Sequence, residues 1–137
     1  MIHNNFTMGV IMILSGLLSS MYIWSDKISD IRLSINDIYM TTLMTSWMFF
    51  FMGLLNFNKQ MLLLSGAAIV IIFICIRNQV FVSRNQFWNG MIPHHSMAVL
   101  MSKQLLKNEN LNQTEKEFVK NIIITQEKEI NWMKKVN

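Results

Sequence analysis

The chain has 137 residues, of which 52% are hydrophobic and only 15% are charged, whereas soluble domains carry about 25% charged residues. This balance suits lipid better than water. The length also leaves no room for a large soluble catalytic core beside a membrane region, so any functional site must be small.

The formal net charge of +4 lies entirely in the second half of the chain. Residues 1–76 hold three Lys/Arg and three Asp/Glu, whereas residues 77–137 hold nine Lys/Arg and five Asp/Glu. A basic tail beside a membrane is attracted to anionic lipid headgroups, at about 1 kcal/mol per well-placed cation. Lysine alternates with glutamate in this tail and no aromatic-basic patch occurs, which argues against nucleic-acid binding.

The first apolar stretch covers residues 7–24 and carries no charge. Its length suits a hydrocarbon core of about 30 Å, so it is the first predicted membrane span. Tyr22 and Trp24 stand where interfacial aromatic residues are typical. Because no Lys or Arg precedes the stretch, we expect a retained anchor rather than a cleaved signal. Residues 25–37 carry five charges and are expected to lie outside the hydrocarbon core.

Two further spans are predicted over residues 38–57 and 61–82, and the short polar connector between them indicates a helical hairpin. The uncharged part of the last span, residues 61–76, is a little short, so we expect residues 80–82 to prolong that helix. Small residues at 65–68 either allow another helix to approach closely or are simply tolerated in lipid.

Three spans place the two ends of the chain on opposite sides of the bilayer. Four cations near the span ends would share a side with the tail, against Lys59 alone on the other side; they are Lys27, Arg32, Arg77 and Arg84. The positive-inside rule therefore favours a cytoplasmic tail. The predicted division is a multi-pass membrane domain over residues 1–84 and a water-facing tail over residues 85–137.

The tail is predicted to form two helices. The first covers about residues 85–106, and a polar stretch rich in asparagine follows. The second begins at a capping box of Thr114 and Glu117. It continues to the C-terminus with apolar residues at three- and four-residue spacing, which is typical of an amphipathic helix.

The first tail helix carries an unusual group of thioethers and imidazoles. On a helix, Met91 neighbours His94 and His95, while Met97 and Met101 continue the His94 side. Thioethers select soft ions, Cu(I) above all, and imidazole also binds Cu(II), zinc and iron. The alternative is that the methionines fill a core and the histidines are partly exposed interfacial residues.

The second tail helix has polar residues beside its apolar stripe. Gln126 and Glu129 interrupt the stripe, and Met133 follows one turn later. If the two helices pack antiparallel, Glu129 and Met133 would approach the start of the first helix near His94. The alternative is that Glu129 is a rim residue paired with a lysine.

These two motifs resemble those of the DUF305 family. The matching sequences are FWNGMIPHHSMA at residues 87–98 and QEKEINWM at residues 126–133, and the resemblance covers about residues 85–137. It implies a ferritin-like helical fold and a copper site, because the family is regarded as ferritin-like and includes copper-binding members. Some members of the family resemble this chain in having membrane helices before the motif. The metal-site residues that it implies are Met91, His94, His95, Gln126, Glu129 and Met133. Val136 stands where an aromatic residue is common in the family.

The tail supplies one helical hairpin, which is half of a four-helix bundle. Two hairpins would rebuild the bundle and bury both stripes, so we expect at least a dimer. The sequence thus predicts an all-α fold of three membrane helices followed by this hairpin.

The leading functional hypothesis is a membrane-anchored protein that binds copper, or another transition metal, in sequestration, delivery or tolerance. One rival is a structural membrane protein whose basic tail mediates oligomerisation or binds lipid or a partner. A metal-dependent oxidase is the second rival. It is disfavoured because the first tail helix has no carboxylate beside its histidines.

Overall fold

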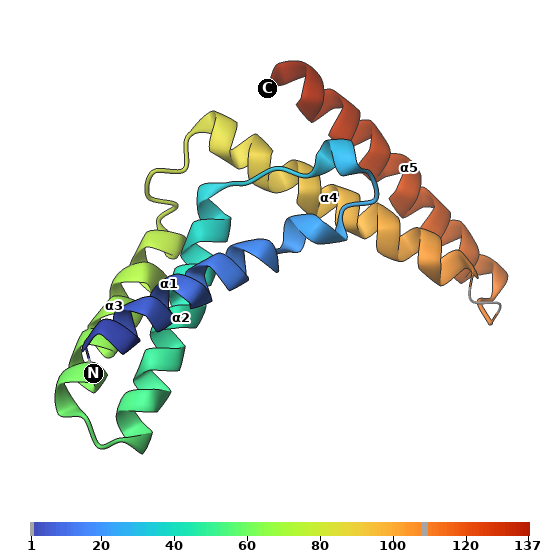
Figure 1. Cartoon of the computed structure of the whole chain (residues 1–137). Coiled ribbons are helices and arrows are strands. Elements are labelled where there is room, and N and C mark those ends of the chain that lie inside the picture. The colour runs from blue at the N-terminus through green and yellow to red at the C-terminus, as the bar shows by residue number, and fades with distance from the viewer. Residues whose placement is uncertain (1, 108–109) are drawn as a thin grey trace. The chain divides into compact units, whose positions relative to one another are not determined.

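The computed structural model describes residues 2–107 and 110–137, and this part of the chain contains helices and no strand. The predicted all-α fold is confirmed. Figure 1 shows the elements in chain order. They are α1 (Ile2–Leu18), the short 3-10 helices η1 (Met21–Trp24) and η2 (Ile28–Asp30), α2 (Ile35–Leu55), α3 (Lys59–Arg77), α4 (Arg84–Lys107) and α5 (Gln113–Val136).

The chain forms two compact units. One comprises the chain up to Ser20 together with Ile35–Val82, and the other comprises Met21–Ser34 together with Ser83–Asn137. This division differs from the predicted boundary at residue 84, because the segment between α1 and α2 belongs with the tail. We call Met21–Ser34 the docking segment.

Three helices at the N-terminal side are long and apolar enough to cross a membrane: Asn5–Trp24, Ile35–Leu55 and Lys59–Arg77. Their large apolar side chains mostly face outward, whereas the buried residues are small and, apart from Gly53, polar. The Thr45 and Ser65 hydroxyls donate to carbonyls one turn earlier in their own helices, at 2.8 and 2.6 Å. Such hydroxyls need no water, which suits a lipid environment.

Glycines allow the closest approaches among these helices. A Cβ on Gly16 would lie 2.8 Å from Cγ2 of Thr41, so α1 packs tightly on α2 only because Gly16 has no side chain. A Cβ on Gly53 would lie 3.0 Å from the Leu62 nitrogen, where α2 meets α3. In the predicted small-residue stretch, by contrast, a Cβ on Gly66 would make only an ordinary contact with Phe50.

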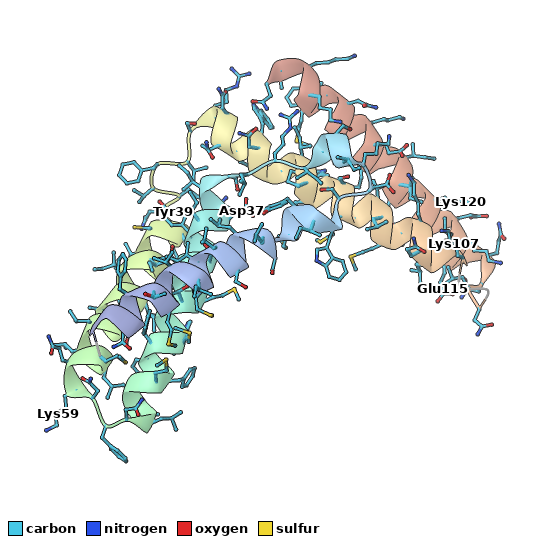
Figure 2. The ribbon with its side chains drawn as sticks, in the orientation of Figure 1. Asp37, Tyr39, Lys59, Lys107, Glu115 and Lys120 are labelled. Atoms are coloured by element: carbon cyan, nitrogen blue, oxygen red, sulfur yellow. The ribbon has the colours of Figure 1, made fainter. Side chains whose placement is uncertain are left out.

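Helix α3 ends at Arg77, five residues before the predicted end of the third span. Gln79 and Phe81 have φ angles of 48° and 60°, which an α-helix cannot accommodate. The Val80 carbonyl accepts a hydrogen bond of 2.5 Å from the hydroxyl of Tyr39. Tyr39 lies near the start of α2 (Figure 2). The apolar residues 80–82 therefore form a turn that packs on α2 and do not prolong the helix.

The tail is a hairpin of α4 and α5, which lie side by side and antiparallel (Figure 1). The bounds of α4 agree with the predicted helix to within a residue. The capping box at the start of α5 is formed by Asn112 and Glu115, whose side chains each accept a backbone N–H of the other, at 2.9 and 2.8 Å. The predicted box of Thr114 and Glu117 is wrong, because Asn112 caps as well as threonine and comes first.

The hairpin core is small. Its buried members come from both helices, and partly buried side chains pack against them. The buried set is Ile92, Val99, Ile130 and Met133, and the surrounding set is Trp88, Met91 and Ile123.

Candidate metal centre

The two sequence motifs meet across the hairpin at His95 and Glu129. The Nδ1 atom of His95 lies 2.9 Å from Oε2 of Glu129. This nitrogen is buried, but the contact lacks the directional geometry of a hydrogen bond. The partner of Glu129 is thus an imidazole of the first motif, as expected from antiparallel packing. It is His95, however, and not the neighbouring His94.

His94 points elsewhere. Adjacent helical residues diverge by about 100°, and the two imidazole centroids are 6.1 Å apart with 65° between the ring planes. His94 is exposed, Met97 is half-buried, and Met101 is 56% exposed. With spacings of three and four residues, these three side chains form one accessible stripe on α4. We call His94, Met97 and Met101 the donor stripe.

Of the remaining predicted ligands, Met91 and Met133 face the apolar interior. Met133 is only 4% exposed and belongs to the hairpin core, and the partly buried Met91 packs against that core. Gln126 is half-buried. Within residues 2–107 and 110–137, no three His, Cys, Asp or Glu side chains are placed to hold one metal ion together.

Aromatic rings flank the motif near the start of α4. Trp88 makes edge-to-face contacts with Phe87 and Trp132, with centroid distances of 4.9 and 5.4 Å. The Trp88 Nε1 atom is buried, and the described part of the chain offers it no hydrogen-bond partner. The Trp88–Trp132 contact ties the start of α4 to the end of α5, next to Met91 and Met133 in sequence.

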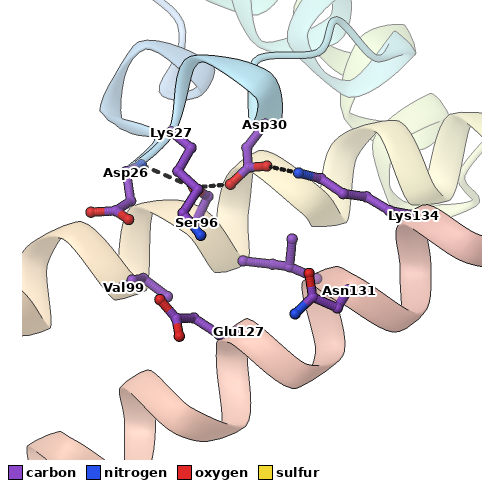
Figure 3. A pocket seen from close by; sticks show the side chains of 9 residues that line it. Asp26, Lys27, Asp30, Ser96, Val99, Glu127, Asn131 and Lys134 are labelled. Atoms are coloured by element: carbon purple, nitrogen blue, oxygen red, sulfur yellow. Dashed lines mark hydrogen bonds and ion pairs between the residues drawn. The ribbon is translucent and has the colours of Figure 1, made fainter.

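Ser96, directly after the two histidines, holds the docking segment. Its side chain is fully buried. The hydroxyl donates to Oδ2 of Asp30 at 2.7 Å and accepts from the Asp26 backbone N–H at 2.9 Å. Lys134 of α5 forms an ion pair with the other oxygen of Asp30 (Figure 3). The motif is thereby joined to residues more than 60 positions earlier in the chain.

Electrostatics keeps Asp30 ionised although only 1% of it is exposed. Burial by itself would raise the pKa of this carboxyl. Hydrogen bonds from Lys134 and Ser96, together with the positive charges of Lys134 and Lys27, outweigh burial and hold the pKa of Asp30 below its usual value.

A second ion pair involves Lys103, which lies two turns after Ser96 on α4. The Lys103 ammonium is 2.7 Å from Asp26 and 3.4 Å from Glu127. Its hydrogen bond to Asp26 and the two negative charges raise the pKa of Lys103 above its usual value. Between the two ion pairs lies a cavity of about 40 Å³, lined by docking-segment, α4 and α5 residues (Figure 3). That volume is enough for a water molecule or two.

Sequence reasoning did not find this docking. Asp26 and Asp30 stand four residues apart, but Asp26 precedes the 3-10 helix Ile28–Asp30, so no helical spacing relates the two carboxylates. Nothing in the spacing shows that their partners are Ser96, Lys103 and Lys134, because these contacts arise only from tertiary packing.

The chain is thus an all-α protein with three helices apolar enough to span a membrane, followed by a helical hairpin that carries the histidine motif. Residues 79–137 match the model of the family described as "Domain of unknown function (DUF305)". The chain is also 41% identical over 127 residues to "Uncharacterized protein L153" of Acanthamoeba polyphaga mimivirus, covering 89% of this chain and 83% of the viral protein. No solved structure matches.

The chain belongs to the family of the mimivirus protein, and its C-terminal part is a DUF305 domain. The 127 aligned residues exceed the length of that domain, so the likeness extends into the apolar helices. The resemblance expected from the histidine motif is confirmed for the domain.

Proposed function

We propose that this is a multi-pass membrane protein that binds copper on its DUF305 hairpin and serves in copper sequestration, delivery or tolerance. The observation that carries the proposal is the donor stripe. One imidazole and two thioethers share an accessible face of α4. Soft sulfur donors beside imidazole suit copper and disfavour magnesium and calcium, which prefer oxygen.

The contact between His95 and Glu129 supports the same function. A carboxylate that accepts a hydrogen bond from one imidazole nitrogen orients the ring and makes the other nitrogen a better metal ligand, and on this proposal the His95 ring turns to form that bond with Glu129 when metal binds. Since Glu129 lies 2.9 Å from Nδ1 of His95, Nε2 is the nitrogen left for a metal. In this account Met91 and Met133 stabilise the hairpin by packing, and Gln126 lies beside Glu129 on α5.

The donor stripe comes from a single helix, so a second hairpin is the natural source of further ligands. We therefore retain the proposal of a dimer, in which two hairpins form a four-helix bundle. The cytoplasmic placement of the tail likewise rests on the distribution of Lys and Arg around the three spans.

One observation favours a structural role for the tail instead. Met91 and Met133 pack in or against the apolar core, as expected if the methionines of the motif are core residues. On that account the hairpin mediates oligomerisation or binds lipid or a partner, and copper is irrelevant.

Competition titration of Cu(I) against a chromogenic chelator separates the two, using the full chain in detergent. Met101→Leu keeps the side-chain volume and removes only the sulfur. Met21→Leu is the matched control, because Met21 is 53% exposed and lies outside the motif. We expect His94→Ala and Met101→Leu each to weaken Cu(I) binding at least tenfold, and Met21→Leu to leave it unchanged.

The Glu129→Gln variant tests the orienting role, since losing such a partner typically weakens metal binding about 10- to 100-fold. If His94→Ala and Met101→Leu both bind Cu(I) as tightly as the parent, copper binding at this motif is refuted and the structural role takes its place.

A further inference from the structure

The docking segment has the opposite arrangement to a loop in water. Its polar residues Asp30 and Ser34 are buried, at 1% and 4% exposure. Ile28 is the most exposed of its large apolar side chains, at 88%. The others also face outward; they are Met21, Ile23, Trp24, Ile31 and Leu33. Six large apolar side chains on so short a segment form a patch of the kind that marks an interaction surface.

The polar contacts fix this arrangement. Asp30 is held by Ser96 and Lys134, and Asp26 is held by Lys103. Turning the segment over to bury its apolar side would break both ion pairs, leaving Lys134 without its carboxylate and Lys103 with Glu127 alone. The apolar side therefore faces outward as long as the segment is docked on the hairpin.

The position of the segment in the chain indicates what it faces. It begins with Met21–Trp24, which is the end of the candidate span Asn5–Trp24, and it ends at Ser34, directly before the span Ile35–Leu55. Both ends thus stand at a membrane boundary.

The composition of the outward side agrees. Trp24 belongs to the residue type that is enriched at the interface between water and lipid. Lys27 is exposed and Arg32 is half-exposed, and cations at this depth are attracted to anionic headgroups.

We propose that the outward side of the docking segment lies in the headgroup layer of a bilayer that contains anionic lipid. Through Asp26 and Asp30 the segment then holds the DUF305 hairpin at the membrane surface. The inference rests on the membrane anchoring in the proposed function and not on copper binding.

Spin labelling of the full chain in nanodiscs tests this, with lipid of phosphatidylcholine and phosphatidylglycerol. Cys75, the one cysteine of the chain, is replaced by serine, and a nitroxide is attached to Ile28→Cys. Collision rates with oxygen, which concentrates in lipid, and with a water-soluble nickel chelate report the depth of the label. The control is Ile124→Cys, because Ile124 is exposed on α5.

A third label at Leu64→Cys reports on span insertion, since Leu64 is exposed on α3. We expect the ratio of oxygen to nickel collisions to be several-fold higher at Ile28 than at Ile124, and highest at Leu64. Equal ratios at Ile28 and Ile124, with a lipid reading at Leu64, would overturn the interfacial contact alone. An aqueous reading at Leu64 as well would overturn the membrane anchoring itself. Shielding of Ile28 from both reagents would assign this side to a protein partner or a second copy, and would also refute the lipid contact.

Discussion

Replacing Ser96 by alanine should release the docking segment while leaving the hairpin folded. The Ser96→Ala change keeps the Cβ and removes one hydroxyl that serves Asp30 and the Asp26 amide. The Asp26 N–H retains an acceptor, because it also lies 3.3 Å from the Ser96 carbonyl oxygen. The loss is therefore mainly one hydrogen bond to a buried carboxylate, worth about 1.5–3 kcal/mol.

Hydrogen exchange measures this release directly in the full-length protein. A loss of about 2 kcal/mol corresponds to roughly 30-fold faster exchange, at 1.36 kcal/mol per factor of ten. We expect that acceleration in peptides covering residues 25–34 and little change in α5. Ser102→Ala is the matched control, because Ser102 is a buried serine further along the same helix. Exchange in residues 25–34 that is the same for Ser96→Ala and Ser102→Ala would refute the assigned role of Ser96.

Three further predictions concern pH, topology and assembly. The pKa of Asp30 is lower in the folded state than the ordinary aspartate pKa of about 4. The ionised carboxylate therefore stabilises docking fully above about pH 4, and this stabilisation is lost as the pH falls through the lowered pKa of Asp30. A spin label at Ile28 should thus gain mobility on acidification in the parent, and this response should be absent in Asp30→Asn. Gln104 and Phe57 are both exposed, and single cysteines at these positions should react with an impermeant reagent from opposite sides of the membrane. Labelling of Gln104→Cys in intact cells would show that the tail lies outside and that the predicted orientation is wrong. Ile122→Lys places a cation beside the half-covered stripe of α5 and should dissociate the oligomer in detergent; an unchanged mass by light scattering would argue against assembly through the tail.

The helices could be predicted because each is specified by local patterns. The three apolar stretches are long enough to span a bilayer, and the periodicity of residues 85–137 indicates an amphipathic hairpin. The helix ends were harder to predict. Asn112 and Thr114 can both cap a helix, and the apolar residues 80–82 would continue a helix on hydropathy alone. The positive φ angles at Gln79 and Phe81 depend on the packing of this turn against Tyr39.

The sequence could predict which residues belong to the candidate site, but not which of them are buried or what they contact. Periodicity places Met133 on the same stripe as Ile130, and the structure buries both. A thioether in a core and a thioether on a metal have the same spacing, so only burial separates Met133 from the exposed Met101. The partners of Asp26 and Asp30 lie on α4 and α5, and no local pattern encodes a contact across such a separation.

Copper binding by the donor stripe is the central claim, and elemental analysis of the purified full-length protein tests it most directly. The protein is loaded with a mixture of transition metals and dialysed in detergent before measurement. We predict that copper is retained in a stoichiometric amount over zinc, iron and manganese. The double variant with His94→Ala and Met101→Leu should lose it. A parent protein without copper, or a double variant that retains as much copper as the parent, would contradict the account.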